Sequence, residues 1–75
     1  MIDPKPKASQ YLNQSVERMI EILRLYIGDV DELTATEISK HLSFSQSTVF
    51  RFLVTLEYYG FLQRNPENNK YRLGV

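Results

Sequence analysis

Two helix-start signals stand close together in the middle of this chain, and few folds accommodate such a pair. Thr34 is followed three residues later by Glu37, which is the pattern of a capping box, and Ser45 is a favourable N-cap for a further helix. Only the short break Ser43-Phe44-Ser45 separates the two helical segments. The spacing therefore predicts a short helix, a tight turn and a second helix over about 46–59, which together form a helix-turn-helix.

Helical spacing of apolar residues also predicts a helix before this motif. We expect it to begin near Ser15 as N-cap, with Glu17 in its first turn where a negative charge suits the helix dipole, and to end at Gly28. The 46–59 helix should end at Gly60. The core-facing positions predicted for the three helices are Val16, Met19, Ile20, Leu23, Tyr26 and Ile27, then Ala35, Ile38 and Leu42, then Val49, Phe52, Leu53, Leu56 and Tyr59.

The C-terminal segment is strand-like and turns back on itself. Residues 61–65 lead into the turn-rich tetrad Pro66-Glu-Asn-Asn69, and residues 70–73 alternate polar with apolar side chains. In a strand, alternate side chains point to opposite faces. The expected faces are the helices for Tyr71 and Leu73, and solvent or a phosphate backbone for Lys70 and Arg72.

These segments predict a mainly α fold, a three-helix winged helix-turn-helix. Residues 14–75 form the domain, and its C-terminal two-stranded β-hairpin, over 61–74, is the wing. Residues 1–13 contain two prolines and two lysines and are expected to form a flexible N-terminal arm.

Length and composition exclude several classes of function. The 75 residues make one small domain without room for a cleft between two lobes, and 43% hydrophobic and 24% charged residues argue against global disorder. The chain has no cysteine, and His41 is its only histidine, so we expect no disulfide, no metal site, no cofactor and no enzymatic activity. It also lacks an apolar run long enough to span a membrane and a signal-peptide core, which predicts a cytoplasmic protein.

Charge is unevenly distributed although the net charge is zero. Residues 1–38 carry four basic and seven acidic side chains, 4 − 7 = −3, whereas residues 39–75 carry five and two, 5 − 2 = +3. The basic half contains the second helix of the helix-turn-helix, as binding of DNA phosphates requires. A split of this size also arises by chance in a small domain, so its value lies in coinciding with the motif.

The outward side of the 46–59 helix carries side chains that can contact DNA. Ser47 and Thr48 lie in its first turn, where free backbone amides favour a phosphate, although Thr48 can instead complete the helix cap. Arg51 can bind a phosphate or pair with guanine, or it can be an ordinary surface arginine. Phe50 can touch a thymine methyl group or pack on the preceding helix, and the sequence does not separate these two roles.

The hairpin adds further cations that a solvated surface would also explain. Arg64, Lys70 and Arg72 can lie along the backbone or enter the minor groove, and Lys5 and Lys7 of the arm can contact phosphates. The residues predicted to contact DNA are Thr34, Thr36, Ser45, Gln46, Ser47, Thr48, Phe50, Arg51, Arg64, Lys70 and Arg72.

Some apolar residues of the first helix lie outside its predicted core stripe. Ile22 and Leu25 are two such residues, and Tyr11 would join them if the helix extended backwards. Extra apolar surface of this kind is typical of a self-association face, so we predict a homodimer that binds a palindromic operator. Singly exposed apolar residues are, however, common on protein surfaces.

Several short motifs, taken in order, resemble the N-terminal DNA-binding domain of IclR-type bacterial transcriptional regulators. The matching segments are Ser15-Val-Glu-Arg18, Leu33-Thr-Ala-Thr-Glu-Ile38, Ser47-Thr-Val49 with Arg51, Leu56-Glu57 before Gly60, and Tyr71-Arg-Leu-Gly74. The resemblance implies a winged helix-turn-helix that binds double-stranded DNA, and a first helix that helps to pair two such domains. It also implies a longer parent protein with a linker helix and an effector-binding domain, the alternative being a natural stand-alone repressor or anti-regulator, and no small-molecule ligand is expected within these residues.

The chain departs from the family pattern around the turn. Members usually carry glycine at Ser43, leucine at Phe44, proline at Ser45 and a basic residue at Gln46. These departures concern the base preference more than the fold. The sequence thus predicts sequence-specific DNA binding in a transcriptional repressor or activator, and the alternative is a winged helix that binds protein through Phe50, Tyr58 and the wing.

Overall fold

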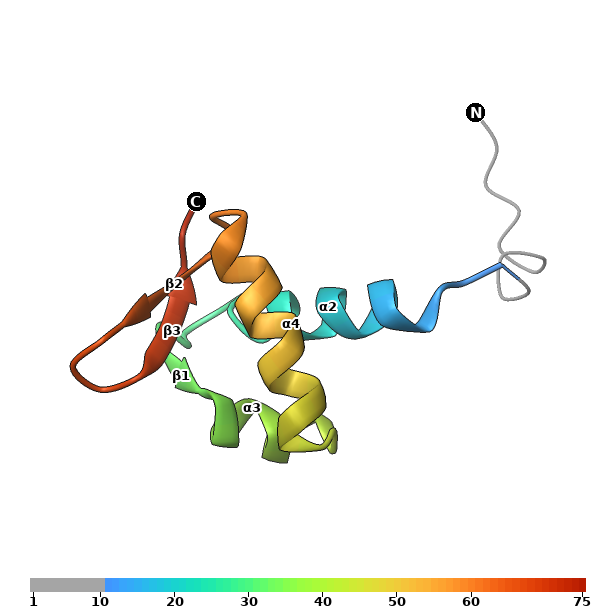
Figure 1. Cartoon of the computed structure of the whole chain (residues 1–75), viewed down its shortest axis with the longest axis horizontal. Coiled ribbons are helices and arrows are strands. Elements are labelled where there is room, and N and C mark those ends of the chain that lie inside the picture. The colour runs from blue at the N-terminus through green and yellow to red at the C-terminus, as the bar shows by residue number, and fades with distance from the viewer. Residues whose placement is uncertain (1–10) are drawn as a thin grey trace.

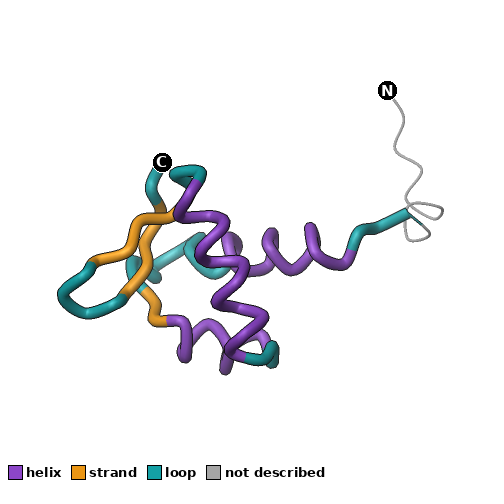
Figure 2. The backbone as a smooth tube through the Cα atoms, viewed as in Figure 1, coloured by secondary structure: helices purple, strands orange, loops and turns teal. Residues whose placement is uncertain are grey.

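The computed structural model describes residues 11–75, and they form the predicted winged helix-turn-helix (Figure 1). The arm predicted over 1–13, with Lys5 and Lys7, lies mostly outside the described residues. The elements are α2 (Gln14–Arg24), β1 (Leu33–Thr34), α3 (Ala35–Leu42), α4 (Gln46–Tyr58), β2 (Leu62–Asn65) and β3 (Lys70–Leu73). The strands gather at one end of the molecule, and α2 extends away from the opposite side (Figure 2).

The N-cap of α2 lies two residues before the predicted one. Asn13 has an extended backbone, and its side-chain oxygen accepts a hydrogen bond from the Val16 amide at 3.1 Å, so Asn13 is the N-cap and Ser15 lies inside the helix. An asparagine carboxamide caps a helix as well as a serine hydroxyl does, and the apolar pattern alone does not choose between them. Glu17 occupies the first turn, as predicted.

The buried side of α2 differs from the predicted stripe. Ile22 is fully buried and Tyr26, just beyond the helix, is 5% exposed, whereas Val16 and Ile20 are about half exposed and Ile27 is largely exposed. The N-terminal half of α2 runs beyond α3 and α4 (Figure 1), so these two helices do not bury the apolar side chains there. The core consists of Ile22, Tyr26, Leu33, Ile38, Val49, Leu53, Leu56, Leu62 and Tyr71.

The predicted capping box of α3 is present in full. The Thr34 hydroxyl oxygen accepts a hydrogen bond from the Glu37 amide at 3.1 Å, and the Thr34 amide donates to Glu37 Oε1 at 2.8 Å. The segment before this cap was not predicted as a strand. Leu33 and Thr34 form β1, which pairs antiparallel with β3, so the sheet has three strands in the order β1-β3-β2.

The connection between α3 and α4 is as short as predicted. Ser43 ends α3 in the left-handed conformation, with φ of 58°, and Ser45 is the N-cap of α4, its hydroxyl oxygen accepting from the Thr48 amide at 3.1 Å. Two contacts hold this turn in place. The Ser39 hydroxyl donates to the Phe44 carbonyl oxygen, and the Arg18 guanidinium of α2 lies 5.1 Å from the centre of the Phe44 ring.

The helix α4 buries Val49, Leu53 and Leu56, as predicted, but not Tyr59. Tyr59 is 70% exposed; it is the C-cap residue, one position beyond the last residue of α4. The rings of Tyr58 and Tyr59 instead pack edge to face, with their centres 4.9 Å apart.

The wing is closed at its tip and at its base. At the tip, Asn69 takes a left-handed φ of 58°, and at the base the Gly74 amide donates to the Phe61 carbonyl oxygen at 2.9 Å. Tyr71 is buried as predicted, whereas Leu73 is 41% exposed because it lies at the open end of β3. The Tyr26 hydroxyl donates to the Tyr71 carbonyl oxygen at 2.9 Å, which fastens the wing to the end of α2.

Candidate nucleic-acid interface

The first two turns of α4 present a polar, acid-free surface. The side chains of Gln46, Ser47 and Arg51 are exposed, and the first turn contains no acidic residue. Among residues 11–75 Arg51 takes part in no ion pair. Its guanidinium is therefore available to an external anion, and its backbone carbonyl accepts a hydrogen bond from the Thr55 hydroxyl at 2.9 Å.

Two of the predicted contact residues serve the helix cap instead of standing free. The Ser45 hydroxyl donates to the Thr48 hydroxyl oxygen at 2.9 Å while it accepts from the Thr48 amide. Thr48 is half-buried, so its side chain follows the capping alternative. Ser45 and Thr48 thus set the direction of the first turn, and Ser47 next to them remains exposed.

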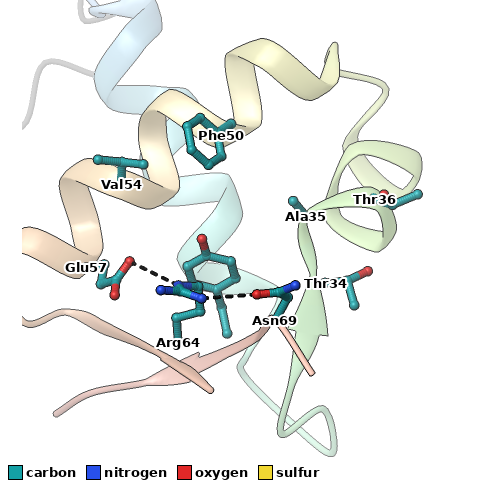
Figure 3. Close-up of a pocket in the computed structure, with 9 residues that line it drawn as sticks. Thr34, Ala35, Thr36, Phe50, Val54, Glu57, Arg64 and Asn69 are labelled. Atoms are coloured by element: carbon teal, nitrogen blue, oxygen red, sulfur yellow. Dashed lines mark hydrogen bonds and ion pairs between the residues drawn. The ribbon is translucent and has the colours of Figure 1, made fainter. Parts of the chain in front are cut away.

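A hollow of about 500 Å³ separates the N-terminus of α3, the middle of α4 and the wing (Figure 3). Four of the predicted DNA-contacting residues meet there, namely Thr34, Thr36, Phe50 and Arg64. Thr34 is occupied by the capping box, whereas Thr36 is exposed in the first turn of α3. The hollow therefore combines an apolar wall from α4 with hydroxyl, guanidinium and carboxylate groups, the last from Glu57.

Arg64 is held at the edge of this hollow by two partners. Its Nε lies 3.9 Å from Glu57 Oε1 on α4, and its Nη1 donates to Asn69 Oδ1 at 3.0 Å (Figure 3). Both charged side chains are 38% exposed, and an exposed pair at this distance contributes at most about 1 kcal/mol to stability. The two contacts orient the guanidinium without burying it.

The strand register divides the cations of the wing between two faces. Arg64 lies opposite Tyr71 across the β2–β3 pair, and residues directly opposite each other share a face of the sheet. Lys70 and Arg72 lie opposite Asn65 and Gln63 and therefore belong to the other face. Arg72 donates from Nε and Nη2 to Gln63 Oε1 at 3.3 Å in each case. The three predicted wing cations thus do not form a single surface.

The residues predicted for a dimer interface do not form one surface either. Ile22 has no exposed area and Leu25 is half-buried against the core, while Tyr11 is 80% exposed. The prediction for Ile22 is therefore wrong, because its side chain is part of the hydrophobic core.

The structure reveals an apolar hollow that the sequence did not indicate. It lies between α2 and the C-terminal end of α4, encloses about 290 Å³, and is lined by Val16, Met19, Ile20, Leu23, Thr55, Leu56, Tyr59 and Phe61. Several of these residues had been predicted as core because their helical spacing is that of a buried face. Their exposure, which the helical pattern did not predict, shows that this hollow is a second apolar surface.

Two absences concern the described part of the chain. Within residues 11–75, no group of three or more His, Cys, Asp or Glu side chains is arranged to hold a metal ion. No helix among these residues combines the length and the apolar character that crossing a membrane requires.

A capped helix pair, an exposed second helix and a closed hairpin define the winged helix-turn-helix class of DNA-binding domains. A family model described as the IclR helix-turn-helix domain matches residues 15–66. The chain belongs to this family, and it is a DNA-binding domain of the kind found in bacterial transcriptional regulators.

Relatives and solved structures agree with this assignment. The chain is 48% identical over 62 residues to the HTH-type transcriptional regulator XynR of Escherichia coli, a match that covers 83% of this chain and 25% of the relative. A crystal structure of an IclR transcriptional regulator from Alicyclobacillus acidocaldarius superposes with a TM-score of 0.80 at 32% identity, covering 87% of this chain and 26% of that one.

A second solved structure supports the fold alone. The IclR family transcriptional regulator from Brucella abortus gives a TM-score of 0.84 at 22% identity, covering 99% of this chain and 28% of that one. The chain thus spans about a quarter of the length of the relatives it matches.

Proposed function

We propose that this domain reads a specific double-stranded DNA sequence by placing the N-terminal turns of α4 in the major groove. The exposed, acid-free surface formed by Gln46, Ser47 and Arg51 is the observation that supports this proposal most directly. Ser47 and the free amides of the first turn bind a phosphate, and Arg51 reaches a base edge or a phosphate. Ser45 and Thr48 act indirectly, by directing that turn.

The wing and the start of α3 position the domain on the DNA backbone. Thr36 and Arg64 flank the hollow between α4 and the wing, and a sugar-phosphate strand can pass there. Lys70 and Arg72 approach a phosphate or the minor groove from the other face of the wing. These contacts supply affinity and orientation, whereas α4 supplies sequence preference.

Selection from a random duplex pool at low salt tests this proposal and provides a binding site. Arg51→Ala should then weaken binding to the selected duplex by about 1–3 kcal/mol, or roughly tenfold or more, if the guanidinium reads a base. Arg24→Ala on α2 is the matched control and should leave the affinity nearly unchanged. Failure to recover any sequence, together with concentration-dependent self-association through Phe50 and Tyr58, would favour the protein-binding alternative.

We further propose that two copies pair on a palindromic site through the apolar hollow between α2 and α4. Val16, Ile20 and Phe61 are each about half exposed at this hollow, and apolar side chains line it apart from Thr55. Clustered apolar surface of this kind on a small domain is stabilised when a second copy covers it. Half-sites about one helical turn apart would match such a pair.

A charge in this hollow should weaken pairing without affecting DNA contacts. Ile20→Glu is expected to abolish cooperative binding to the full palindrome and to leave the affinity for a single half-site unchanged, since Ile20 is distant in sequence from α4's first turns. Fluorescence anisotropy with half-site and full-site duplexes measures both quantities. Tyr11→Ser tests the exposed residue of the interface predicted from sequence, and cooperativity that survives Ile20→Glu but not Tyr11→Ser would move the interface to the N-terminal end.

The chain corresponds to about a quarter of its relatives, which are transcriptional regulators. We therefore propose that it serves as the DNA-reading part of a cytoplasmic regulator, without enzymatic activity of its own. Effector binding would then be the task of residues beyond this domain.

A further inference from the structure

Two apolar side chains lie on the exposed surface of α4. Phe50 is 56% exposed and Val54 is 43% exposed, although both belong to a small domain that needs its apolar residues for the core. They are four residues apart and therefore lie on the same side of α4, on successive turns (Figure 3). Neither belongs to the buried core, so the fold itself does not account for them.

The surroundings of Phe50 decide between the two roles that its sequence position allows. A ring packed on α3 would be largely covered, but more than half of the Phe50 side chain is open to solvent. Phe50 and Val54 instead form one wall of the hollow, with Ala35 of α3 across from them and Thr36 and Arg64 at the rim (Figure 3). Glu57 also lines this hollow, and its carboxylate pairs with Arg64, so the charges there balance and the apolar wall is the distinctive feature of the hollow.

The major groove of DNA contains an apolar group that such a wall can contact. Base edges there present hydrogen-bond donors and acceptors and a single kind of apolar group, the C5-methyl of thymine. Phe50 and Val54 have no hydrogen-bonding group in their side chains, so the methyl group is the part of a base edge that they can recognise.

We propose that Phe50, supported by Val54, makes this domain selective for thymine by contacting its methyl group. This inference rests on the proposed insertion of α4 into the major groove. Phe50 lies about 6 Å along the axis from Gln46, at 1.5 Å per residue, which keeps it in the part of the helix that contacts base edges. The step of about 6 Å from Phe50 to Val54 corresponds to roughly two base steps of 3.4 Å, so one or two neighbouring thymines are read.

The test removes the methyl group and nothing else. The duplex recovered by selection is synthesised with 2′-deoxyuridine in place of each thymine in turn, which preserves every hydrogen-bonding group of the base edge. Wild-type protein should bind about fourfold more weakly at the contacted position, as expected for one methyl group withdrawn from an apolar contact. The other thymines should be indifferent to the replacement.

A protein variant then assigns the methyl contact to its residue. In Phe50→Ala the ratio of affinities for the thymine and uracil duplexes should fall to about one, because the variant no longer contacts the methyl group. Tyr58→Ala is the matched control: Tyr58 is an exposed aromatic residue of the same helix, and it lies about 12 Å further along the axis than Phe50. Tyr58→Ala should keep the fourfold ratio, and circular dichroism should show both variants folded, since neither residue belongs to the core.

Each result separates this inference from the function on which it rests. A selected site without thymine, or wild-type binding that ignores uracil at every position, would overturn the role of Phe50 and leave DNA binding intact. A fourfold loss that persists in Phe50→Ala would assign the methyl group to another residue and would equally overturn it. If no duplex is bound at any salt concentration, the proposed function itself fails.

Discussion

Thr34 and Glu37 begin α3 through two reciprocal hydrogen bonds, and one of them is sensitive to pH. The hydrogen bond from the Thr34 backbone amide lowers the pKa of the Glu37 carboxyl group from its ordinary value of 4.5. A lowered pKa in the folded state means that folding favours the charged carboxylate. The resulting stabilisation is fully present above the ordinary value and is lost as the pH falls through the lowered one.

Glu37→Gln should therefore reduce stability only where the carboxylate is charged. We expect the difference in free energy of unfolding between wild type and variant to be constant from about pH 7 to pH 5 and to shrink towards pH 3. Urea unfolding across this range measures it, and Thr36→Ala is a control in the same helical turn that should show no such dependence. A difference that stays constant down to pH 3 would mean that the charge of Glu37 is irrelevant to the cap.

Among single elements, the turn between α3 and α4 contains the most unusual backbone. Ser43 has φ of 58°, a left-handed conformation that costs a non-glycine residue roughly 1–2 kcal/mol. Ser43→Gly should relieve this cost, and part of the gain is offset because glycine is freer in the unfolded chain. We expect a net stabilisation of up to about 1 kcal/mol, visible as a thermal midpoint raised by a few degrees.

Gly60 offers the reverse substitution at the end of α4. Its φ is 84°, and a Cβ atom built there meets no other atom within 4 Å, so that Gly60→Ser tests backbone strain without a clash. It should lower the thermal midpoint. If Ser43→Gly also lowers the midpoint, then the serine side chain stabilises the turn in a way that outweighs the left-handed strain.

The whole molecule is neutral but polarised, and this polarity bears on how it meets DNA. The excess of basic residues lies in the half that contains α4 and the wing, whereas the acidic excess lies in the half that contains α2. A duplex with its dense phosphate charge favours approach by the acid-free start of α4, whereas on the other face of the wing Lys70 and Arg72 share a hollow with the acidic Asp31 and Glu32. Neutrality overall is therefore compatible with a strong dependence of binding on salt.

Lys70 provides a quantitative test of this orientation. If Lys70 contacts a phosphate, Lys70→Ala should weaken binding equally for all sequences and reduce the slope of log affinity against log salt by about one. The Arg24→Ala variant on α2 should leave the slope unchanged. Identical slopes for Lys70→Ala and wild type, measured by anisotropy from low to moderate salt, would remove this face of the wing from the interface.

Much of the fold could be predicted because its boundaries depend on short-range interactions. The caps at Thr34 and Ser45, the turn at 66–69 and the alternation around Tyr71 each involve residues within a few positions of one another. The exposure of Ser47 and Arg51 followed from the same reasoning, since a helix with one apolar stripe exposes the opposite side. Their contact with DNA remains a prediction.

The predictions that were wrong concern partners distant in the chain. Helical periodicity placed Ile20 in the predicted core stripe of α2 and Ile22 outside it, but it did not show that Ile22 faces the core while Ile20 faces the hollow beside Phe61. The strand β1 was missed for a similar reason. Two residues carry no periodicity, and Leu33 becomes part of a strand only because β3 runs alongside it.

By itself, the amino-acid sequence determined the order of the helices and the wing, the caps at Thr34 and Ser45, and the exposed side chains at the start of α4, since capping, turn chemistry and helical periodicity act over one or two turns of chain. Only the tertiary structure decided how α2 divides its apolar residues between core and surface, and that Arg64 faces the reading helix while Lys70 and Arg72 face away from it. These outcomes depend on which elements pack together and in which register, and such contacts join residues whose separation along the chain leaves no local trace.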